Sequence, residues 1–175
     1  MEVLPPDPVD DDIIKASYDK RTRVTANGHH IVRLEFTSAF EMLDFVQVVS
    51  DHVCGSIGMD EDSAHWISVA IRESVINAIK HGNRNDSSKS VFVEFETTRG
   101  SREAEGPELS IKVRDQGEGF EPEEVADPLA PENLLKSSGR GIFLIRNFMD
   151  AVHLQRAPEG GMQIQMIKRV QPSGS

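Results

Sequence analysis

The most informative stretch of the sequence is Glu73-Ser74-Val75-Ile76-Asn77-Ala78-Ile79-Lys80-His81-Gly82-Asn83. Glu73, Asn77 and His81 are spaced four residues apart, so on a helix they stack along one edge. That edge lies roughly 60–140° from the centre of the apolar stripe, on the border between core and solvent where a pocket lining lies. The same spacing also fits a solvated stripe of helix surface, and both interpretations stay open at this point.

The side chains on this edge suit a cation site with an acid–base group beside it. Asn77 offers a neutral oxygen to a hard cation such as Mg²⁺, which prefers few protein ligands together with water and phosphate oxygens. Glu73, one turn earlier, is placed to accept a proton from a hydroxyl or water near that cation.

The stretch belongs to a predicted helix over residues 60–81, with Gly82 as its stop signal. Val69 and Ile76 lie away from the main apolar stripe, which predicts that the helix is covered by a sheet and also by a preceding helix. The apolar stripe with i, i+3, i+4, i+7 spacing consists of Ile67, Ala70, Ile71, Ser74, Val75, Ala78 and Ile79.

A first helix is predicted before it. Ser38 has the character of an N-cap, and Glu41 follows at the capping-box spacing. The helix should end near Gly55 or Gly58. Its apolar positions are Phe40, Leu43, Val46, Val49 and Val53.

Five segments alternate or run apolar in the manner of strands. They are residues 31–36, 90–97, 109–113, 152–154 and 162–167, the last two joined by a turn at Gly160-Gly161. The predicted order is completed by a hairpin loop over 99–107, a long Gly- and Pro-rich loop or lid over 117–138 and a helix over 141–149. Helices and strands come in runs, which predicts an α+β two-layer sandwich. No P-loop pattern is present, and neither Gly-x-Gly opens a Rossmann unit.

A second motif, Val113-Arg114-Asp115-Gln116-Gly117-Glu118-Gly119-Phe120, follows a predicted strand. The glycines Gly117 and Gly119 let the backbone approach a ligand closely. Asp115 can accept the exocyclic amine of adenine, which selects adenine because a buried carboxylate left unpaired is costly.

A third motif, Ser137-Ser138-Gly139-Arg140-Gly141-Ile142-Phe143-Leu144-Ile145-Arg146, begins a predicted helix. Gly139 and Gly141 leave free N–H groups at the positive end of the helix dipole, where an anion binds. Arg140 adds a fixed cation suited to a terminal phosphate. A capped helix with a flexible hinge is the alternative for this segment taken alone.

Together, in order and spacing, the three motifs resemble the N, G1 and G2 boxes of the Bergerat (GHKL) ATP-binding fold. Within that superfamily the chain is similar to bacterial anti-sigma-factor serine kinases over about residues 31–169. The resemblance implies a mixed sheet covered on one face by about three helices. It also implies ATP and Mg²⁺ as cofactors.

The resemblance carries over residue by residue. It implies that Glu73 is the general base for a serine or threonine hydroxyl, that Asn77 binds Mg²⁺ and that Asp115 reads adenine. Gly117 and Gly119 would give the base room. The residues expected near the phosphates are Lys80, His81, Gly139, Arg140 and Gly141.

The family implies a kinase that phosphorylates a small anti-anti-sigma antagonist, sequesters a sigma factor and forms a homodimer. The alternative is a non-catalytic ATP-binding module that sequesters a partner without phosphorylating it. A detached histidine-kinase catalytic domain would need a phosphoacceptor hairpin, for which the segment before residue 31 has no room. The larger members of the superfamily need a transducer domain, and a ligand-free structural protein is the remaining alternative.

Composition sets the broad class. A net charge of −10 over 175 residues disfavours binding to a nucleic-acid backbone, whereas Mg²⁺ and local N–H donors still allow ATP. The single cysteine, Cys54, excludes an intrachain disulfide and a thiolate metal cage. We expect no membrane span, no secretory signal and a cytoplasmic location.

Three regions are predicted along the chain. Residues 1–28 are acidic and contain prolines, which predicts a disordered extension without an assigned role. The resemblance implies that residues 29–170 form a histidine-kinase-like ATPase domain, and residues 171–175 are expected to form a tail.

Overall fold

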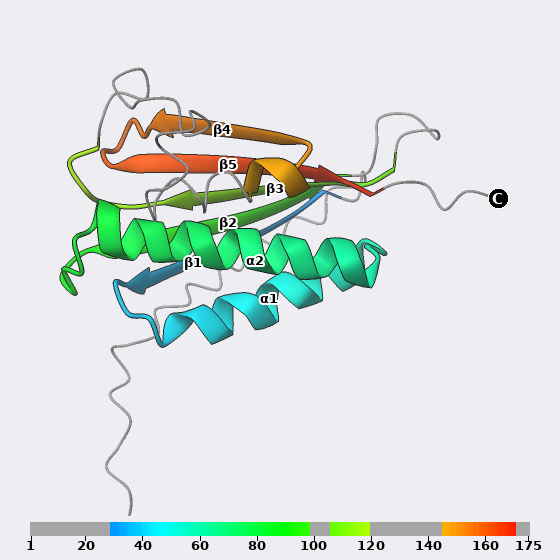
Figure 1. Cartoon of the computed structure of the whole chain (residues 1–175), viewed down its shortest axis with the longest axis horizontal. Helices are drawn as coiled ribbons and strands as arrows, with labels where there is room; N and C mark the ends of the chain where they lie inside the picture. Colours follow the sequence, from blue (N-terminus) through cyan, green and yellow to red (C-terminus); the bar gives the residue numbers. More distant parts are fainter. Residues whose placement is uncertain (1–28, 99–105, 120–144, 171–175) are drawn as a thin grey trace, which may run out of the picture.

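The structure, a computed structural model, describes residues 29–98, 106–119 and 145–170. Its elements form two layers, a sheet and a pair of helices that lie across one face of it (Figure 1). The strands are β1 (His30–Thr37), β2 (Ser90–Thr98), β3 (Glu108–Arg114), β4 (Ala151–Arg156) and β5 (Met162–Arg169). The helices are α1 (Met42–Ser56) and α2 (Glu61–Asn77), and a π turn, Ala78–Gly82, continues α2. Residues 145–148 form a further helical turn.

The described sheet has five strands in the order β1-β2-β3-β5-β4, and all four of its pairings are antiparallel. The α+β sandwich is confirmed, but the prediction of a mixed sheet is wrong for these strands. The physical reason lies in the connection after β1. Two antiparallel helices return the chain to the end where β1 stops, so β2 starts there and runs in the opposite direction. The N–H of Ser38 accordingly donates to the carbonyl of Lys89 at 3.0 Å.

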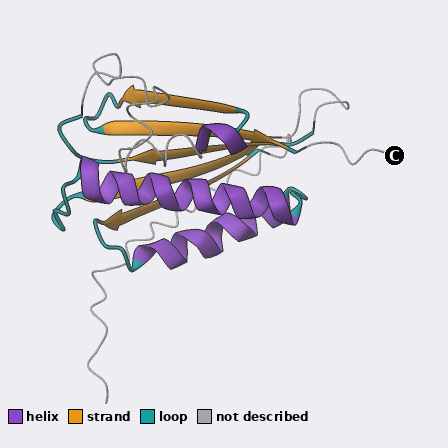
Figure 2. Cartoon of the chain, viewed as in Figure 1, coloured by secondary structure: helices purple, strands orange, loops and turns teal. Residues whose placement is uncertain are grey.

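The core lies between the helices and the sheet, and Figure 2 shows α1 and α2 on the same side of the strands. Every member of the predicted α2 stripe is buried, as are Val91, Val93 and Phe95 of β2. Asp60 caps α2 by accepting the N–H of Ser63 at 2.8 Å. The apolar periodicity therefore predicted both layers correctly, because burial is what produces it.

The prediction that Ser38 caps the first helix is wrong. Helix α1 begins at Met42, and its N-cap position, Glu41, makes no side-chain cap hydrogen bond. The hydroxyl of Ser38 instead donates to the carbonyl of Lys89 at 2.9 Å. Strand β1 ends at Thr37, so Ser38 follows the strand directly. Its hydrogen bond joins the end of β1 to the start of β2.

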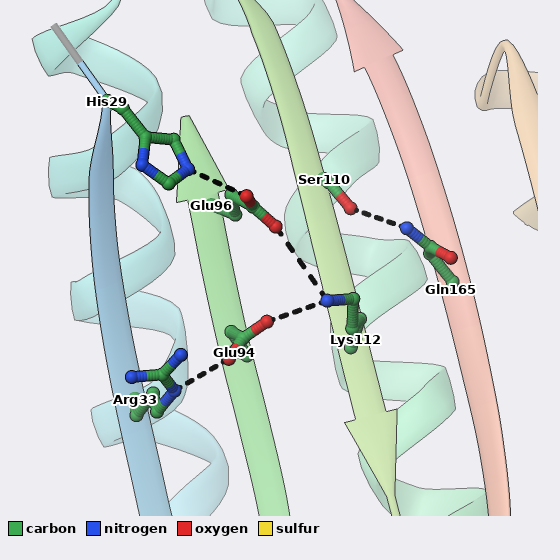
Figure 3. A network of polar contacts seen from close by, with 7 residues as sticks. All are labelled: His29, Arg33, Glu94, Glu96, Ser110, Lys112 and Gln165. Atoms are coloured by element: carbon green, nitrogen blue, oxygen red, sulfur yellow. Dashed lines mark hydrogen bonds and ion pairs between the residues drawn. The ribbon is translucent and has the colours of Figure 1, made fainter. Parts of the chain in front are cut away.

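The face of the sheet opposite the helices carries a ladder of charged side chains (Figure 3). Arg33, Glu94 and Lys112 are in register on β1, β2 and β3, with ion pairs of 2.6 Å and 2.8 Å. Glu96 contacts Lys112 at 3.7 Å and His29 at 2.7 Å. Cross-strand pairs of opposite charge favour this register over a one-residue slip, which would place the charges in the core.

Several predicted segments fall partly outside the described residues. They are the hairpin loop over 99–107, the loop or lid over 117–138 and the start of the helix over 141–149. The turn at Gly160-Gly161 is confirmed, with φ of +96° and +84°. None of the helices within residues 29–98, 106–119 and 145–170 has the length and apolarity needed to cross a bilayer.

Candidate functional site

Asp115 lies just beyond β3 and is a buried carboxylate, only 5% exposed. Its Oδ1 accepts the N–H of Gly117 at 2.8 Å and the N–H of Met162 at 3.1 Å, and its own N–H donates to the carbonyl of Met162 at 3.1 Å. Within the described part of the chain, Oδ2 makes no hydrogen bond. The carboxylate is therefore held in place by one oxygen, and the other keeps its acceptor capacity for a ligand.

Three glycines surround this carboxylate at distances that no side chain would allow. A Cβ at Gly82 would lie 2.3 Å from both Cγ and Oδ2 of Asp115, and one at Gly161 would lie 2.1 Å from its carbonyl oxygen. A Cβ at Gly117 would lie 2.2 Å from the carbonyl oxygen of Gly82. Three parts of the chain thus meet at Asp115. They are the end of the α2 segment (α2 together with the π turn that continues it and Asn83), the loop after β3 and the turn between β4 and β5.

The π turn after α2 is what brings Gly82 to this position. The N–H of Asn83 donates to the carbonyl of Ala78 at 2.7 Å, a bond across five residues instead of four. The sequence predicted an ordinary helix to residue 81, in which His81 stacks on Asn77. The wider turn changes that stacking and leaves Lys80 and His81 exposed. Such π turns occur often at functional sites.

Glu73 and Asn77 lie on α2, the helix that leads into this turn. Both side chains are half-buried, and in the described residues neither one hydrogen-bonds another protein group. The same residues contain no cluster of three or more His, Cys, Asp or Glu side chains that would hold a metal ion without other ligands. A cation at Asn77 would therefore need phosphate and water as its further ligands.

The Gly-x-Gly segment is held from both sides through Glu118. Arg84 pairs with the Glu118 carboxylate at 3.1 Å, and Arg156 donates to the Glu118 carbonyl at 2.6 Å. Gly119 has φ of +72°, which favours glycine at this position. Of the predicted site residues, Gly139, Arg140 and Gly141 lie outside the described residues.

The chemistry of the described groups fits the adenine end of ATP. A fixed acceptor oxygen beside backbone without side chains matches an exocyclic amine on a flat ring. Sequence reasoning predicts Asp115, Gly117 and Gly119 as site residues, whereas it assigns Gly82 to a helix end and Gly161 to a turn. Their closeness to Asp115 is a tertiary contact, and the only local signal for it was that both are glycines.

Comparison with known proteins identifies the fold family. Residues 36–168 match the histidine kinase-like ATPase domain. The chain belongs to this family. The resemblance drawn from the three motifs is therefore confirmed, and a family of ATPase domains supports ATP as the nucleotide.

Relatives of this histidine kinase-like ATPase domain include anti-sigma proteins. An anti-sigma F factor of Oceanobacillus iheyensis is 31% identical over 144 residues, which cover 80% of this chain and 92% of that protein. An anti-sigma F factor of Clostridium perfringens is 32% identical over 143 residues, covering 79% and 96%. The serine-protein kinase RsbW of Staphylococcus epidermidis is 27% identical over 145 residues, covering 79% and 86%. These relatives support an anti-sigma kinase role.

Proposed function

We propose that this protein is an ATP-dependent serine/threonine protein kinase that acts as an anti-sigma factor. Its substrate is a small anti-anti-sigma antagonist, and its second partner is a sigma factor that it sequesters. The observation that carries the proposal is the Asp115 carboxylate, which has one oxygen fixed and one available, at the end of the helix that bears Glu73 and Asn77.

Each site residue has a role in this proposal. Asp115 accepts the amine of adenine, and Gly117 and Gly119 leave room for the ring. Asn77 supplies a neutral oxygen to Mg²⁺. The phosphates are held by Lys80, His81, Gly139, Arg140 and Gly141.

Phosphoryl transfer depends mainly on position and on neutralisation of charge. Bound Mg·ATP supplies the phosphoryl group. Glu73 accepts the proton of the antagonist's hydroxyl, and its half-buried position on α2 allows contact with a docked partner. No hydrogen bond within the described residues competes for this carboxylate, so it is available as a base.

The biological logic is a switch between two partners. Phosphorylation adds charge to the antagonist and ends its competition for the kinase, after which the sigma factor is held. The net charge of −10 suits protein partners better than nucleic acid. A homodimer in the cytoplasm is the form in which we expect the protein to act.

Two measurements test the proposal with the full chain. Mg·ATP should raise the melting temperature, because a ligand that binds only the folded state stabilises it. Labelled phosphate should then pass from ATP to a serine of the antagonist. Stabilisation without transfer would favour the non-catalytic module, and the absence of both would refute nucleotide binding as well.

A further inference from the structure

Asn83 is a fully buried amide directly after the π turn, with 0% of its surface exposed. A buried amide is tolerated when its polar atoms are hydrogen-bonded. Its Nδ2 donates to Ser38 Oγ at 2.8 Å and to the Ser90 carbonyl at 2.9 Å, and its Oδ1 accepts the N–H of Gln116 at 2.8 Å. Both ends of the amide are therefore in use.

The orientation of this amide is determined by its partners. The Ser38 hydroxyl donates its one proton to the Lys89 carbonyl, so it can only accept from Asn83. If the amide were turned over, its NH₂ group would face the N–H of Gln116 and its oxygen would face the Ser90 carbonyl. Donor would then face donor and acceptor would face acceptor, so only the observed orientation satisfies the site.

The three partners of Asn83 come from three neighbouring strand ends. Ser38 follows β1, Ser90 begins β2, and Gln116 lies beyond β3. The Gln116 side chain also accepts the N–H of Ser90 at 2.6 Å. Asn83 thus joins the end of the α2 segment to the strand ends beside Asp115.

The consequence for Asp115 is that three successive backbone N–H groups are fixed. Asp115 N–H bonds to the Met162 carbonyl, Gln116 N–H bonds to Asn83, and Gly117 N–H bonds to the Asp115 carboxylate. Of these three bonds, the one to Asn83 is the only one whose acceptor belongs to the α2 segment. It therefore ties the backbone next to the carboxylate to the residue that follows the π turn.

We propose that Asn83 is a positioning residue for base recognition, because it holds Gln116 and thereby places the free oxygen of Asp115 against the helix end. It touches no nucleotide itself. The proposal rests on the proposed function, in which Asp115 accepts the amine of adenine. It assigns selectivity for adenine in part to Asn83, which ends the first motif but has no role predicted from the sequence.

The test compares Asn83→Ala with Ser38→Ala by calorimetric titration of the full chain with Mg·ATP and Mg·GTP. Ser38→Ala removes one partner of Asn83 and leaves the bond to Gln116, so it should lower the melting temperature without changing the ATP-to-GTP affinity ratio. Asn83→Ala should reduce that ratio by about tenfold, because the Asp115 oxygen loses its fixed position.

The possible outcomes distinguish a failure of the positioning role of Asn83 from a failure of the proposed function on which it rests. A wild-type chain that prefers ATP, together with an unchanged ratio in Asn83→Ala, would overturn the positioning role alone. A wild-type chain that does not distinguish the two nucleotides would overturn the role of Asp115 and this inference together. If Asn83→Ala does not fold, hydrogen exchange of the wild type decides. The N–H of the exposed residue Gln116 should be protected without nucleotide, and exchange at the rate of a free amide would contradict the proposal.

Discussion

The α carbon of Gly82 faces the carboxylate of Asp115 so closely that a methyl group on it would lie 2.3 Å from Cγ and Oδ2. Gly82 does not have a positive φ, so alanine is allowed there by the backbone, and the three atoms nearest to its Cβ would all belong to Asp115. The carboxylate cannot move aside easily, because Gly117 and Met162 hold its other oxygen. The helix end therefore serves as one wall of the candidate base site.

Gly82→Ala should displace Asp115, destabilise the fold by about 1–3 kcal/mol through overpacking and abolish measurable ATP affinity. The control is Gly55→Ala on α1, where an added Cβ meets nothing within 4 Å. That variant should be more stable by roughly 0.5–1 kcal/mol. Chemical denaturation and titration with Mg·ATP measure both effects. Normal ATP affinity in Gly82→Ala would show that Asp115 is not part of the nucleotide site.

Asp115→Asn should invert the preference for the base. Two backbone N–H groups require an oxygen at the Oδ1 position, so the new NH₂ group must take the place of Oδ2. It would then face the amine of adenine as donor against donor, whereas guanine presents an acceptor oxygen. We expect ATP affinity to fall by about tenfold or more and the GTP-to-ATP ratio to rise.

The matched control for that variant is Asp51→Asn on α1, whose carboxylate accepts the Ser68 hydroxyl at 2.9 Å. It makes the same chemical change away from the site and should leave both affinities unaltered. Equal losses in the two variants would mean that the effect is one of stability.

Glu73→Gln should lower phosphoryl transfer to the antagonist by roughly 10²–10⁴-fold while ATP affinity stays the same, because the change removes a base and keeps the shape. Glu61→Gln, in the exposed first turn of the same helix, is the control and should transfer normally. The assay is labelled-phosphate transfer with each variant at saturating Mg·ATP. Full activity of Glu73→Gln would exclude the carboxylate as the base.

The ladder of charged side chains on the outer face of the sheet should make the free energy of unfolding decrease at acid pH. Burial raises the pKa of Glu94, but hydrogen bonds from Lys112 and Arg33 outweigh burial and hold that pKa below its usual 4.5. The folded state then binds this proton more weakly than the unfolded chain. The stabilisation is complete above about pH 4.5 and is lost as the pH falls through the folded-state pKa.

The measurement is the melting temperature of wild type and Glu94→Gln from about pH 7 down to about pH 3. The decline on acidification should be smaller in the variant. Parallel curves would contradict a contribution from Glu94.

At the alkaline end, the hydrogen bond to Glu94 raises the pKa of Lys112 above 10.5. Its contribution is therefore present below that pH and is lost as the pH rises further.

Cys54 should be chemically silent in the folded protein. Burial raises the pKa of this thiol to about 11, and none of its surface is exposed. Since the thiolate is the reactive form, iodoacetamide at neutral pH should label the native chain only through unfolding. Mass spectrometry with and without denaturant measures this. Fast labelling of the native chain would place the thiol nearer to solvent than its contacts indicate.

Much of the fold could be predicted because burial imposes a period on the sequence. The α2 stripe and the alternation of β2 each record which side faces the core. The direction of β2 relative to β1 and the partner of Ser38 could not be found in this way. Both depend on contacts between positions far apart in the chain, such as Ser38 and Lys89.

The site divides along the same line. Asp115, Gly117 and Gly119 carry a local motif, so the sequence alone is enough to propose them as site residues. The positions of Gly82 and Asn83 depend on a π turn. The sequence of residues 78–82 does not predict this turn, because the same residues are compatible with an ordinary α-helix. Their importance follows only from what they meet across the fold.

The stacking of Trp66 on Phe148 gives the protein an optical reporter of its own. Trp66 is the single tryptophan of the chain, and its ring lies 3.8 Å from that of Phe148 with 6° between the planes. Phe148 belongs to the helical turn 145–148, which follows directly on the stretch that contains Arg140. Intrinsic fluorescence therefore reads the packing of that turn on α2 without any added label.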